Sequence, residues 1–90
     1  MVSVFVLAWN HEKYIEQAIR SVISQTYIDI EVLFLDNHSS DQTFRLASTL
    51  LRNSGVKHKV FRRGQNYGIA VNLNLLFEHC NGEYISIISG

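Results

Sequence analysis

The most constraining feature of the sequence is a short apolar run that ends in two polar residues. Val32–Leu35 contains no polar side chain, which is typical of a strand buried on both faces. Asp36 and Asn37 follow directly, and the Ser-x-x-Gln spacing of Ser39–Gln42 predicts a capping box that opens a helix. Ligands of open α/β sheets bind at the carboxyl ends of strands. The stretch therefore predicts either a ligand site or a strand end at which Asp36 merely caps the next helix.

The rest of the chain alternates between apolar runs that are typical of strands and apolar residues at helical spacing. Apolar runs predict strands near 2–8, 31–36, 57–62 and 84–89. Helical spacing predicts helices from Tyr14 to a break at 25–29, from about Asp41 to a stop at 53–55, and from Ile69 to a stop at Asn81–Gly82. This βαβαβαβ order indicates an α/β fold with a parallel four-stranded sheet and helices on both faces.

The strand order 3-2-1-4 is the expected topology of this sheet, with strand 57–62 at an edge. The first two helices then cover one face and the third helix covers the other. Because the order reverses between the first and fourth strands, a crevice should form at their carboxyl ends. The loops that begin at Trp9, Asp36 and Gly64 should converge there.

Composition excludes several classes of protein. The 90 residues are 47% hydrophobic and 18% charged, which fits one small globular domain over 1–90 rather than a disordered chain. Eight basic and eight acidic residues cancel, so net charge gives no support for nucleic-acid or polyanion binding. Cys80 is the single cysteine, which excludes an internal disulfide and favours a reducing, cytoplasmic compartment. No signal peptide is visible, and because the chain stops just after an apolar run we expect a C-terminally truncated piece of a larger protein.

Several polar residues near the expected crevice allow both a functional and a structural interpretation. Trp9 and Asn10 could stack on a planar base and hydrogen-bond to it, or Trp9 could simply plug the end of the sheet. Asn66-x-Gly68 could present backbone N–H groups to an anion, or Asn66 could be an ordinary helix N-cap. Asn72 points either back toward the crevice or into solvent.

Motifs of other functional classes are missing from the sequence. The four histidines show no metal-ligand spacing and fit a polar surface better than a metal site, although His38 lies in the Asp36 loop. No dinucleotide fingerprint or P-loop is present, and nothing supports a nucleophilic triad.

Taken in order, these motifs resemble a known family. The opening Val2–Asn10, His11–Ile15 and Ser24–Tyr27 looks like the start of a family 2 glycosyltransferase with the GT-A fold. Asp36–Thr43, Asn66-Tyr-Gly68 with Asn72, and Gly82–Ile85 are similar to that family's later motifs and follow in the same order. The resemblance covers essentially the whole chain and implies the N-terminal, nucleotide-binding half of a GT-A nucleotide-diphospho-sugar transferase.

The resemblance also implies an activity and a set of binding residues. The activity would be transfer of a sugar from a nucleoside diphosphate sugar to a saccharide or lipid-linked acceptor in cell-envelope polysaccharide synthesis, in the cytoplasm or at the inner face of the membrane. The nucleotide would be held by residues from three loops: Ala8, Trp9, Asn10, Glu12, Asp36, Asn37, Asn66, Gly68 and Asn72. The family's Mg²⁺ or Mn²⁺ ligands and its catalytic base would lie beyond Gly90, so no catalytic or metal-binding residue is expected in these residues.

Two departures from the family pattern bear on the ligand. The chain has Leu7-Ala-Trp-Asn10 where the family usually has Pro-Thr-Tyr-Asn, and Asn37 and His38 replace the second acid and the glycine of Asp-Asp-Gly-Ser. An amide presents a donor and an acceptor but no charge, so the sequence does not decide which nucleotide base is recognised. A non-catalytic nucleotide-binding or interaction module is the alternative function, and the exposed edge of strand 84–89 predicts self-association.

Overall fold

The computed structural model describes residues 1–25 and 29–89, and the predicted βαβαβαβ order is confirmed. The break expected at 25–29 lies partly outside these residues. The strands are β1 (Val2–Ala8), β2 (Ile30–Asp36), β3 (Lys57–Arg62) and β4 (Tyr84–Ser89). The helices are α1 (Ile15–Ile23), α2 (Thr43–Ser54) and α3 (Ile69–His79).

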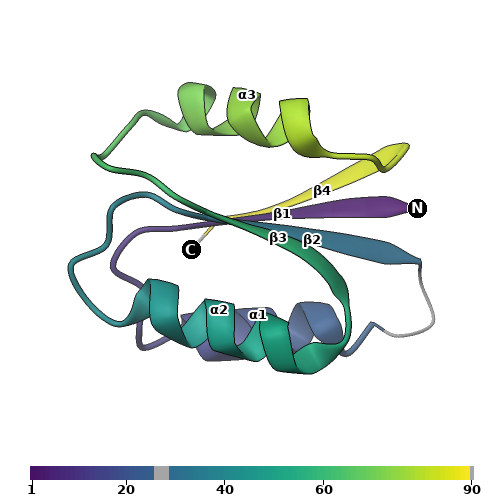
Figure 1. The fold of residues 1–90 in the computed structure, drawn as a ribbon, viewed down its shortest axis with the longest axis horizontal. Coiled ribbons are helices and arrows are strands. Elements are labelled where there is room, and N and C mark those ends of the chain that lie inside the picture. The colour runs from purple at the N-terminus through teal and green to yellow at the C-terminus, as the bar shows by residue number, and fades with distance from the viewer. Residues whose placement is uncertain (26–28, 90) are drawn as a thin grey trace.

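All strand pairs are parallel, and the sheet has the predicted order β3-β2-β1-β4. Figure 1 shows α1 and α2 together on one face of the sheet and α3 alone on the other, as the sequence predicts. The loops that follow β1, β2 and β3 lie at the same end of the sheet, because parallel strands bring their carboxyl ends together (Figure 1).

Alternation along β1 and β2 divides the core into two clusters, one on each face of the sheet. Val4, Val6, Val32 and Phe34 pack under α1 and α2, and the intervening residues pack under α3: Phe5, Leu7, Leu33 and Leu35. The side chains of Val32–Leu35 are 0% exposed, so the strand buried on both faces is confirmed. Strand β3, at the edge, alternates between exposed and half-buried residues.

The helix boundaries differ from the prediction at three places. α1 begins at Ile15 rather than at Tyr14, which is 66% exposed. The capping box is wrong: α2 begins at Thr43, and Asp41 rather than Ser39 accepts hydrogen bonds from the Thr43 N–H (3.0 Å) and hydroxyl (2.5 Å). An Asx turn thus replaces the expected cap, because Ser39 is engaged elsewhere.

Helix α3 also ends differently. Its last residue is His79, and Cys80 is already extended (φ −85°, ψ 152°), so Asn81–Gly82 lies beyond the helix end. Cys80, just beyond the helix end, is half-buried and packs against the α3-side cluster. By contrast, Gly55 stops α2 as predicted, in the left-handed conformation (φ 77°) that L residues avoid.

A buried polar network closes the amino end of the sheet. Glu31 is 0% exposed, and its Oε2 accepts hydrogen bonds from the Ser3 hydroxyl and the Asn81 N–H, both at 2.6 Å. The Gly82 N–H in turn donates to Ser3 Oγ (2.8 Å). The network therefore ties the loop between α3 and β4 to β1 and β2.

Candidate functional site

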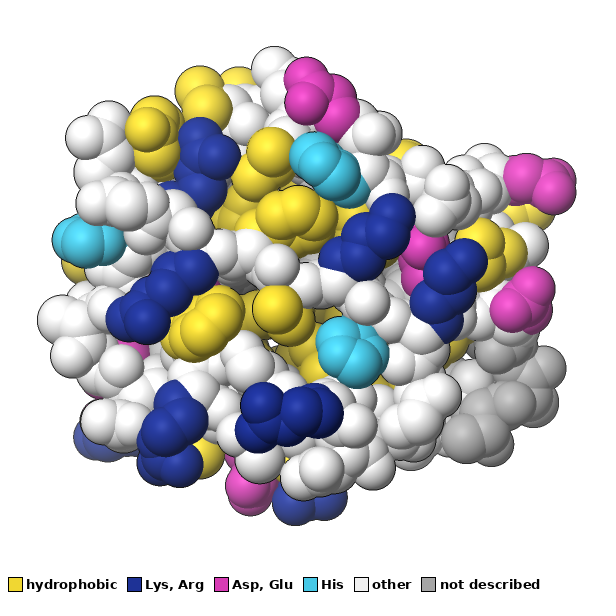
Figure 2. All heavy atoms as spheres, in the orientation of Figure 1, with side chains coloured by type: hydrophobic (Ala, Val, Ile, Leu, Met, Phe, Trp, Pro, Cys, Tyr) yellow, Lys and Arg dark blue, Asp and Glu magenta, His cyan; other side chains and the backbone are white. Residues whose placement is uncertain are grey.

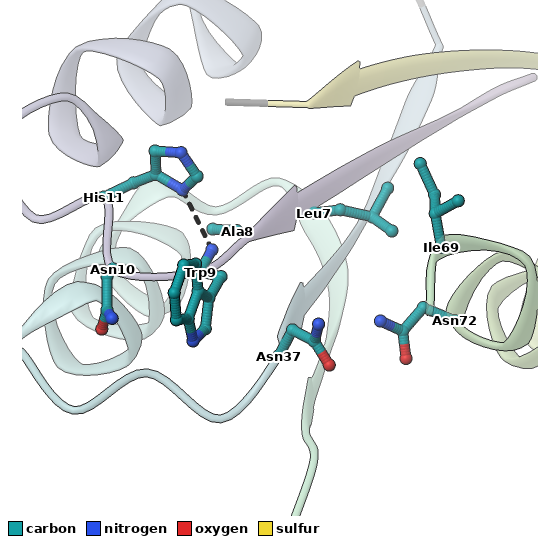
Figure 3. Close-up of a pocket in the computed structure, with 8 residues that line it drawn as sticks. All are labelled: Leu7, Ala8, Trp9, Asn10, His11, Asn37, Ile69 and Asn72. Atoms are coloured by element: carbon teal, nitrogen blue, oxygen red, sulfur yellow. Dashed lines mark hydrogen bonds between the residues drawn. The ribbon is translucent and has the colours of Figure 1, made fainter. Parts of the chain in front are cut away.

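A cavity of about 450 Å³ lies at the carboxyl end of β1, where the sequence places a crevice. Figure 3 shows its lining, which comes from three segments: the end of β1 and the loop after it, the residue after β2, and the first turn of α3. The lining residues are Leu7, Ala8, Trp9, Asn10, His11, Asn37, Ile69 and Asn72. Five of the nine predicted nucleotide-binding residues are among them: Ala8, Trp9, Asn10, Asn37 and Asn72.

The loop after β1 presents an exposed indole to this cavity. Trp9 is 50% exposed, and its backbone N–H donates to His11 Nδ1 at 2.9 Å, the dashed line of Figure 3. Since Nδ1 accepts this bond, the His11 ring carries its proton on Nε2. His11 also lines the cavity, and its ring holds the loop after β1.

Asp36 lies behind the cavity rather than in its wall. Its carboxylate is 0% exposed and accepts hydrogen bonds from the Ser39 N–H (2.8 Å) and the Ser39 hydroxyl (2.5 Å). Ser39 Oγ also accepts from the Asn10 N–H (2.9 Å). A chain of contacts thus runs from Asp36 through Ser39 to the loop that carries Trp9 and Asn10. In this structure Asp36 positions the loop, and Asp41 rather than Asp36 binds the first N–H of α2, that of Thr43.

Both loops at the site contain a residue in the left-handed region. Asn10 has φ 53° and His38 has φ 68°, a conformation that is uncommon for residues other than glycine. Asn10 is held there by its Oδ1, which accepts from the Ser40 N–H (2.9 Å). His38 is exposed and does not line the cavity. Strained backbone of this kind is concentrated at functional sites.

Asn37 joins the end of β2 to the loop before α3. Its Nδ2 donates to Tyr67 O (2.8 Å) and Asn66 Oδ1 (3.1 Å), and its Oδ1 accepts from the Tyr67 N–H (2.8 Å). Both amide hydrogens are therefore engaged, and one acceptor lone pair is left for a ligand. The alternative that Asn66 caps α3 is wrong, because Gly68 is the N-cap and no side chain bonds the free N–H groups there.

Asn72 provides the polar group of the opposite wall. It is 2% exposed, and its Nδ2 lies 3.5 Å from Tyr67 O, while its Oδ1 has no hydrogen-bond partner among the described residues. A buried carbonyl oxygen without a partner costs free energy, so an N–H group from a ligand would be favourable here. Of the two orientations considered for Asn72, the crevice is the one observed.

Glu12, Asn66 and Gly68 do not line the cavity. Glu12 is exposed, and its Oε2 accepts from the Gln42 N–H (3.2 Å). The Glu12 N–H donates to Asp41 Oδ2 (3.2 Å). Burial would raise the pKa of Asp41, but hydrogen bonds from Thr43 and from the Glu12 N–H outweigh it and lower that pKa. These contacts fasten the loop after β1 to the start of α2.

Sequence reasoning missed three residues of the cavity wall: Leu7, His11 and Ile69. Leu7 and Ile69 carry only a core signal in the sequence, and the sequence shows no partner for His11. Across 1–25 and 29–89, no group of three or more His, Cys, Asp or Glu side chains is placed to hold a metal ion. In the same part of the chain, no helix is long and apolar enough to cross a membrane.

Comparison with known proteins assigns the chain to a family. The model of glycosyl transferase family 2 matches residues 3–89, and the chain belongs to this family. Putative glycosyltransferase EpsE of Bacillus subtilis is 31% identical over 94% of the chain. Chondroitin synthase of Escherichia coli is 33% identical over 94% of the chain. The chain spans 31% of the first relative and 12% of the second.

Solved structures share the fold over almost the whole chain. A mannosyltransferase from Pyrobaculum calidifontis, in complex with GDP-Man and Mn²⁺, has a TM-score of 0.90 at 24% identity. TarS residues 1–349 from S. aureus, in complex with UDP, has a TM-score of 0.88 at 28% identity. Each comparison covers 98% of this chain and 26% of the other chain. The fold is thus that of the N-terminal portion of GT-A glycosyltransferases.

Proposed function

We propose that residues 1–90 form the nucleotide-binding part of a glycosyltransferase that moves a sugar from a nucleoside diphosphate sugar to a saccharide or lipid-linked acceptor in cell-envelope polysaccharide synthesis. The observation that carries the proposal is the cavity between Trp9, Asn37 and Asn72 at the carboxyl end of the sheet. Membership of family 2 supports it, as do relatives that include EpsE and chondroitin synthase.

Each wall of the cavity has a role in this proposal. The exposed indole of Trp9 stacks on the base, with Ala8 and Asn10 completing the shelf. Asn72 accepts a hydrogen bond from the ligand through its unpartnered Oδ1, and Asn37 uses its remaining lone pair. Asn66 and Gly68 shape the wall through the Asn37 contacts and the start of α3. Glu12 and Asp36 hold the loops, and Asp36 reaches the ribose only if Ser39 releases it.

The metal belongs to the whole enzyme. Mg²⁺ or Mn²⁺ would neutralise the leaving diphosphate. The described residues provide no cluster of ligands for it. We propose that its ligands and the catalytic base lie in another part of the enzyme. The activity is placed in the cytoplasm or at the inner face of the membrane. Self-association through the open edge of β4 is part of the same proposal.

The test uses the only tryptophan of the protein as a probe. Titration with UDP, GDP and dTDP should quench Trp9 fluorescence, because the base stacks on the indole. Calorimetry should give the same affinities as the fluorescence titration. These should be weak, because the described residues hold no cluster of metal ligands. Asp36→Ala should weaken binding about ten- to hundredfold, because it removes the charge-assisted hydrogen bonds from Ser39 that hold the loop carrying Trp9 and Asn10.

The matched control is Asp29→Ala, at an exposed residue before β2 and thus at the opposite end of the sheet. This variant should bind like the wild type. If none of the three nucleotides altered the fluorescence, or if Asp36→Ala bound them as tightly as the wild type, the assignment of these loops to a nucleotide would be wrong.

A further inference from the structure

The basic residues of the chain are concentrated in one part of the fold. Six of the eight Lys and Arg residues belong to α2, β3 and the residue after β3, and no Asp or Glu occurs between Gln42 and Phe77. The zero net charge therefore conceals a strong segregation of charge. The six residues, which we call the basic face, are Arg45, Arg52, Lys57, Lys59, Arg62 and Arg63.

The basic face coincides with the broad side of the molecule. The principal extents are 34 × 25 × 17 Å, and Figure 2 looks down the shortest of the three. In that view dark-blue side chains are spread over the region where Figure 1 places β3 and α2. The cations thus cover a wide, shallow surface rather than lining a groove.

Few acidic groups neutralise these cations. Within 1–25 and 29–89 the one ion pair joins Arg20 to Glu16 (3.8 Å), and both residues lie on α1. Arg62 and Arg63 lie over the rings of Phe44 and Tyr67, at 4.8 and 3.9 Å from the ring centroids, which leaves their charge uncancelled. Lys59 is the exception, because its Nζ donates to His79 O and its charge is partly offset by the buried Glu31, whose pKa is lowered by stronger local hydrogen bonds and by Lys59. The basic face therefore attracts anions.

We propose that the basic face docks the protein on a membrane surface that carries anionic phospholipids. Clusters of four to eight Lys and Arg residues bind such surfaces, each contributing additively. A planar array of anions can contact the whole of a wide and shallow cationic surface at once, whereas a linear polyanion or an extended peptide contacts only a strip of it. Val60, 41% exposed on β3 between Lys59 and Arg62, adds an exposed apolar side chain to the face.

Docking in this way leaves the cavity accessible. The basic face lies along the β3 edge, whereas the cavity opens at the carboxyl end of β1, beside Trp9 and the first turn of α3. A bilayer against β3 and α2 would therefore lie beside the site and would not cover it. The proposal is independent of the nucleotide, because none of the six residues lines the cavity.

The test is co-sedimentation with vesicles of defined composition. The purified protein should bind vesicles of about 30% phosphatidylglycerol in phosphatidylcholine at 0.1 M salt, and binding should disappear at about 0.5 M salt, because screening shortens the range of the attraction. It should not bind vesicles of pure phosphatidylcholine. Arg45→Glu with Arg52→Glu should reduce the partition coefficient at least tenfold.

The matched control is Lys13→Glu with Arg20→Glu, which changes the net charge equally at exposed residues outside the basic face. This variant should retain binding within about threefold. Circular dichroism checks folding, and Arg45→Gln with Arg52→Gln repeats the test with a milder change. The proposal is overturned if the wild type ignores anionic vesicles or if the control pair loses as much binding as the test pair. Stronger binding to heparin or to single-stranded RNA than to the vesicles, in competition, would overturn it too.

Discussion

Asn37 stands where the family pattern usually has an acid, and its contacts explain why an amide suits this chain. Both of its N–H groups are donated to the loop before α3, to Tyr67 O and Asn66 Oδ1. A carboxylate would turn both contacts into repulsions between oxygen atoms. The residue at position 37 therefore depends on the conformation of the 66–68 loop as well as on the ligand.

Asn37→Asp should accordingly lower the free energy of unfolding by about 1–3 kcal/mol, because the part-buried Tyr67 O and the exposed Asn66 Oδ1 lose their donor and face a carboxylate oxygen instead. Urea denaturation measures the loss. Asn74→Asp, on the exposed side of α3, is the matched control and should change stability by less than about 0.5 kcal/mol. Equal effects of the two substitutions would mean that the Asn37 contacts contribute nothing to stability.

For single residues, the sequence predicts where a polar side chain lies better than it predicts what that side chain contacts. The polar pair after β2 was located correctly, because an apolar run ending in polar residues has few interpretations. The role of each residue depends on partners that a local pattern does not contain: Asn66 and Tyr67 lie about 30 residues away from Asn37. His38 has a φ of 68°, which the local sequence does not predict for a histidine. This conformation explains why glycine is usual at that place in the family pattern.

Among the elements, the loop between α3 and β4 shows how closely backbone can approach backbone. A Cβ at Gly82 would lie 2.5 Å from Ser3 Oγ, 2.6 Å from Ser3 N and 2.9 Å from Met1 O. Two of these three atoms belong to the backbone of β1 and its start, so a side chain at this position cannot be accommodated by a change of rotamer.

Gly82→Ala should therefore destabilise the protein by about 1–3 kcal/mol, the usual cost of overpacking. Gly64→Ala is the matched control, since a Cβ there meets nothing within 4 Å. Thermal unfolding of the two variants should show a lower midpoint for the first only. A Gly82→Ala protein as stable as the wild type would show that the loop has room to move away from β1.

The buried Glu31 makes the amino end of the sheet sensitive to acid. Burial would raise the pKa of this carboxyl, but hydrogen bonds from Ser3 and Asn81 and the charge of Lys59 outweigh it and hold the pKa below its ordinary value of 4.5. A carboxyl whose pKa is lowered by folding stabilises the protein fully above its unfolded-state pKa. That contribution is lost as the pH falls through the folded-state pKa.

Unfolding free energies measured from pH 7 to pH 2 should therefore decline below about pH 4.5 in the wild type. Glu31→Gln should be less stable at pH 7 and should show a shallower decline. Glu16→Gln, an exposed carboxyl on α1, serves as the control and should leave the slope unchanged. Parallel curves for Glu31→Gln and the wild type would exclude Glu31 as the source.

The topology of the elements was predictable because the period changes from strand to helix at each boundary. The first residues of the helices were less predictable. Two acceptors, Ser39 and Asp41, compete for the start of α2, and only the packing of Ser39 against Asp36 decides between them. Similarly, Ile69 and Phe77 of α3 are 60% and 48% exposed despite their apolar character, since α3 packs on β1 and β2 and leaves β4 uncovered.

For the molecule as a whole, the two edges of the sheet are of opposite character. The β3 edge carries Lys57, Lys59 and Arg62, the kind of charged edge that natural proteins use against strand pairing. The β4 edge carries Tyr84, Ile85 and Ile87, which are 69%, 39% and 49% exposed. Net charge and overall hydropathy average over both edges, which is why composition predicts neither this asymmetry nor the basic face.

We expect the chain as a whole to bind a nucleotide without catalysing sugar transfer. The described residues include the cavity that we propose for a nucleotide but no cluster of metal ligands. The 90-residue chain should therefore bind nucleoside diphosphates without transferring or hydrolysing the sugar. Incubation with radiolabelled UDP-GlcNAc and GDP-Man in the presence of Mn²⁺ measures this, and turnover above the buffer rate would contradict it.

The β4 edge leads to the last prediction, which concerns self-association. Strand β4 pairs with β1 on one side only, so its other side presents backbone N–H and C=O groups next to exposed isoleucines. A second copy can supply both the missing hydrogen bonds and an apolar surface.

Sedimentation velocity at rising concentration should therefore show association of the wild type. Ile85→Lys should shift the protein to monomer, because a charge on an edge strand opposes pairing. Val60→Lys makes the same change at an equally exposed position on the β3 edge (41% against 39%) and should leave association unchanged. A wild type that stays monomeric at millimolar concentration, or association that survives Ile85→Lys and is lost with Val60→Lys, would show that β4 is not the contact.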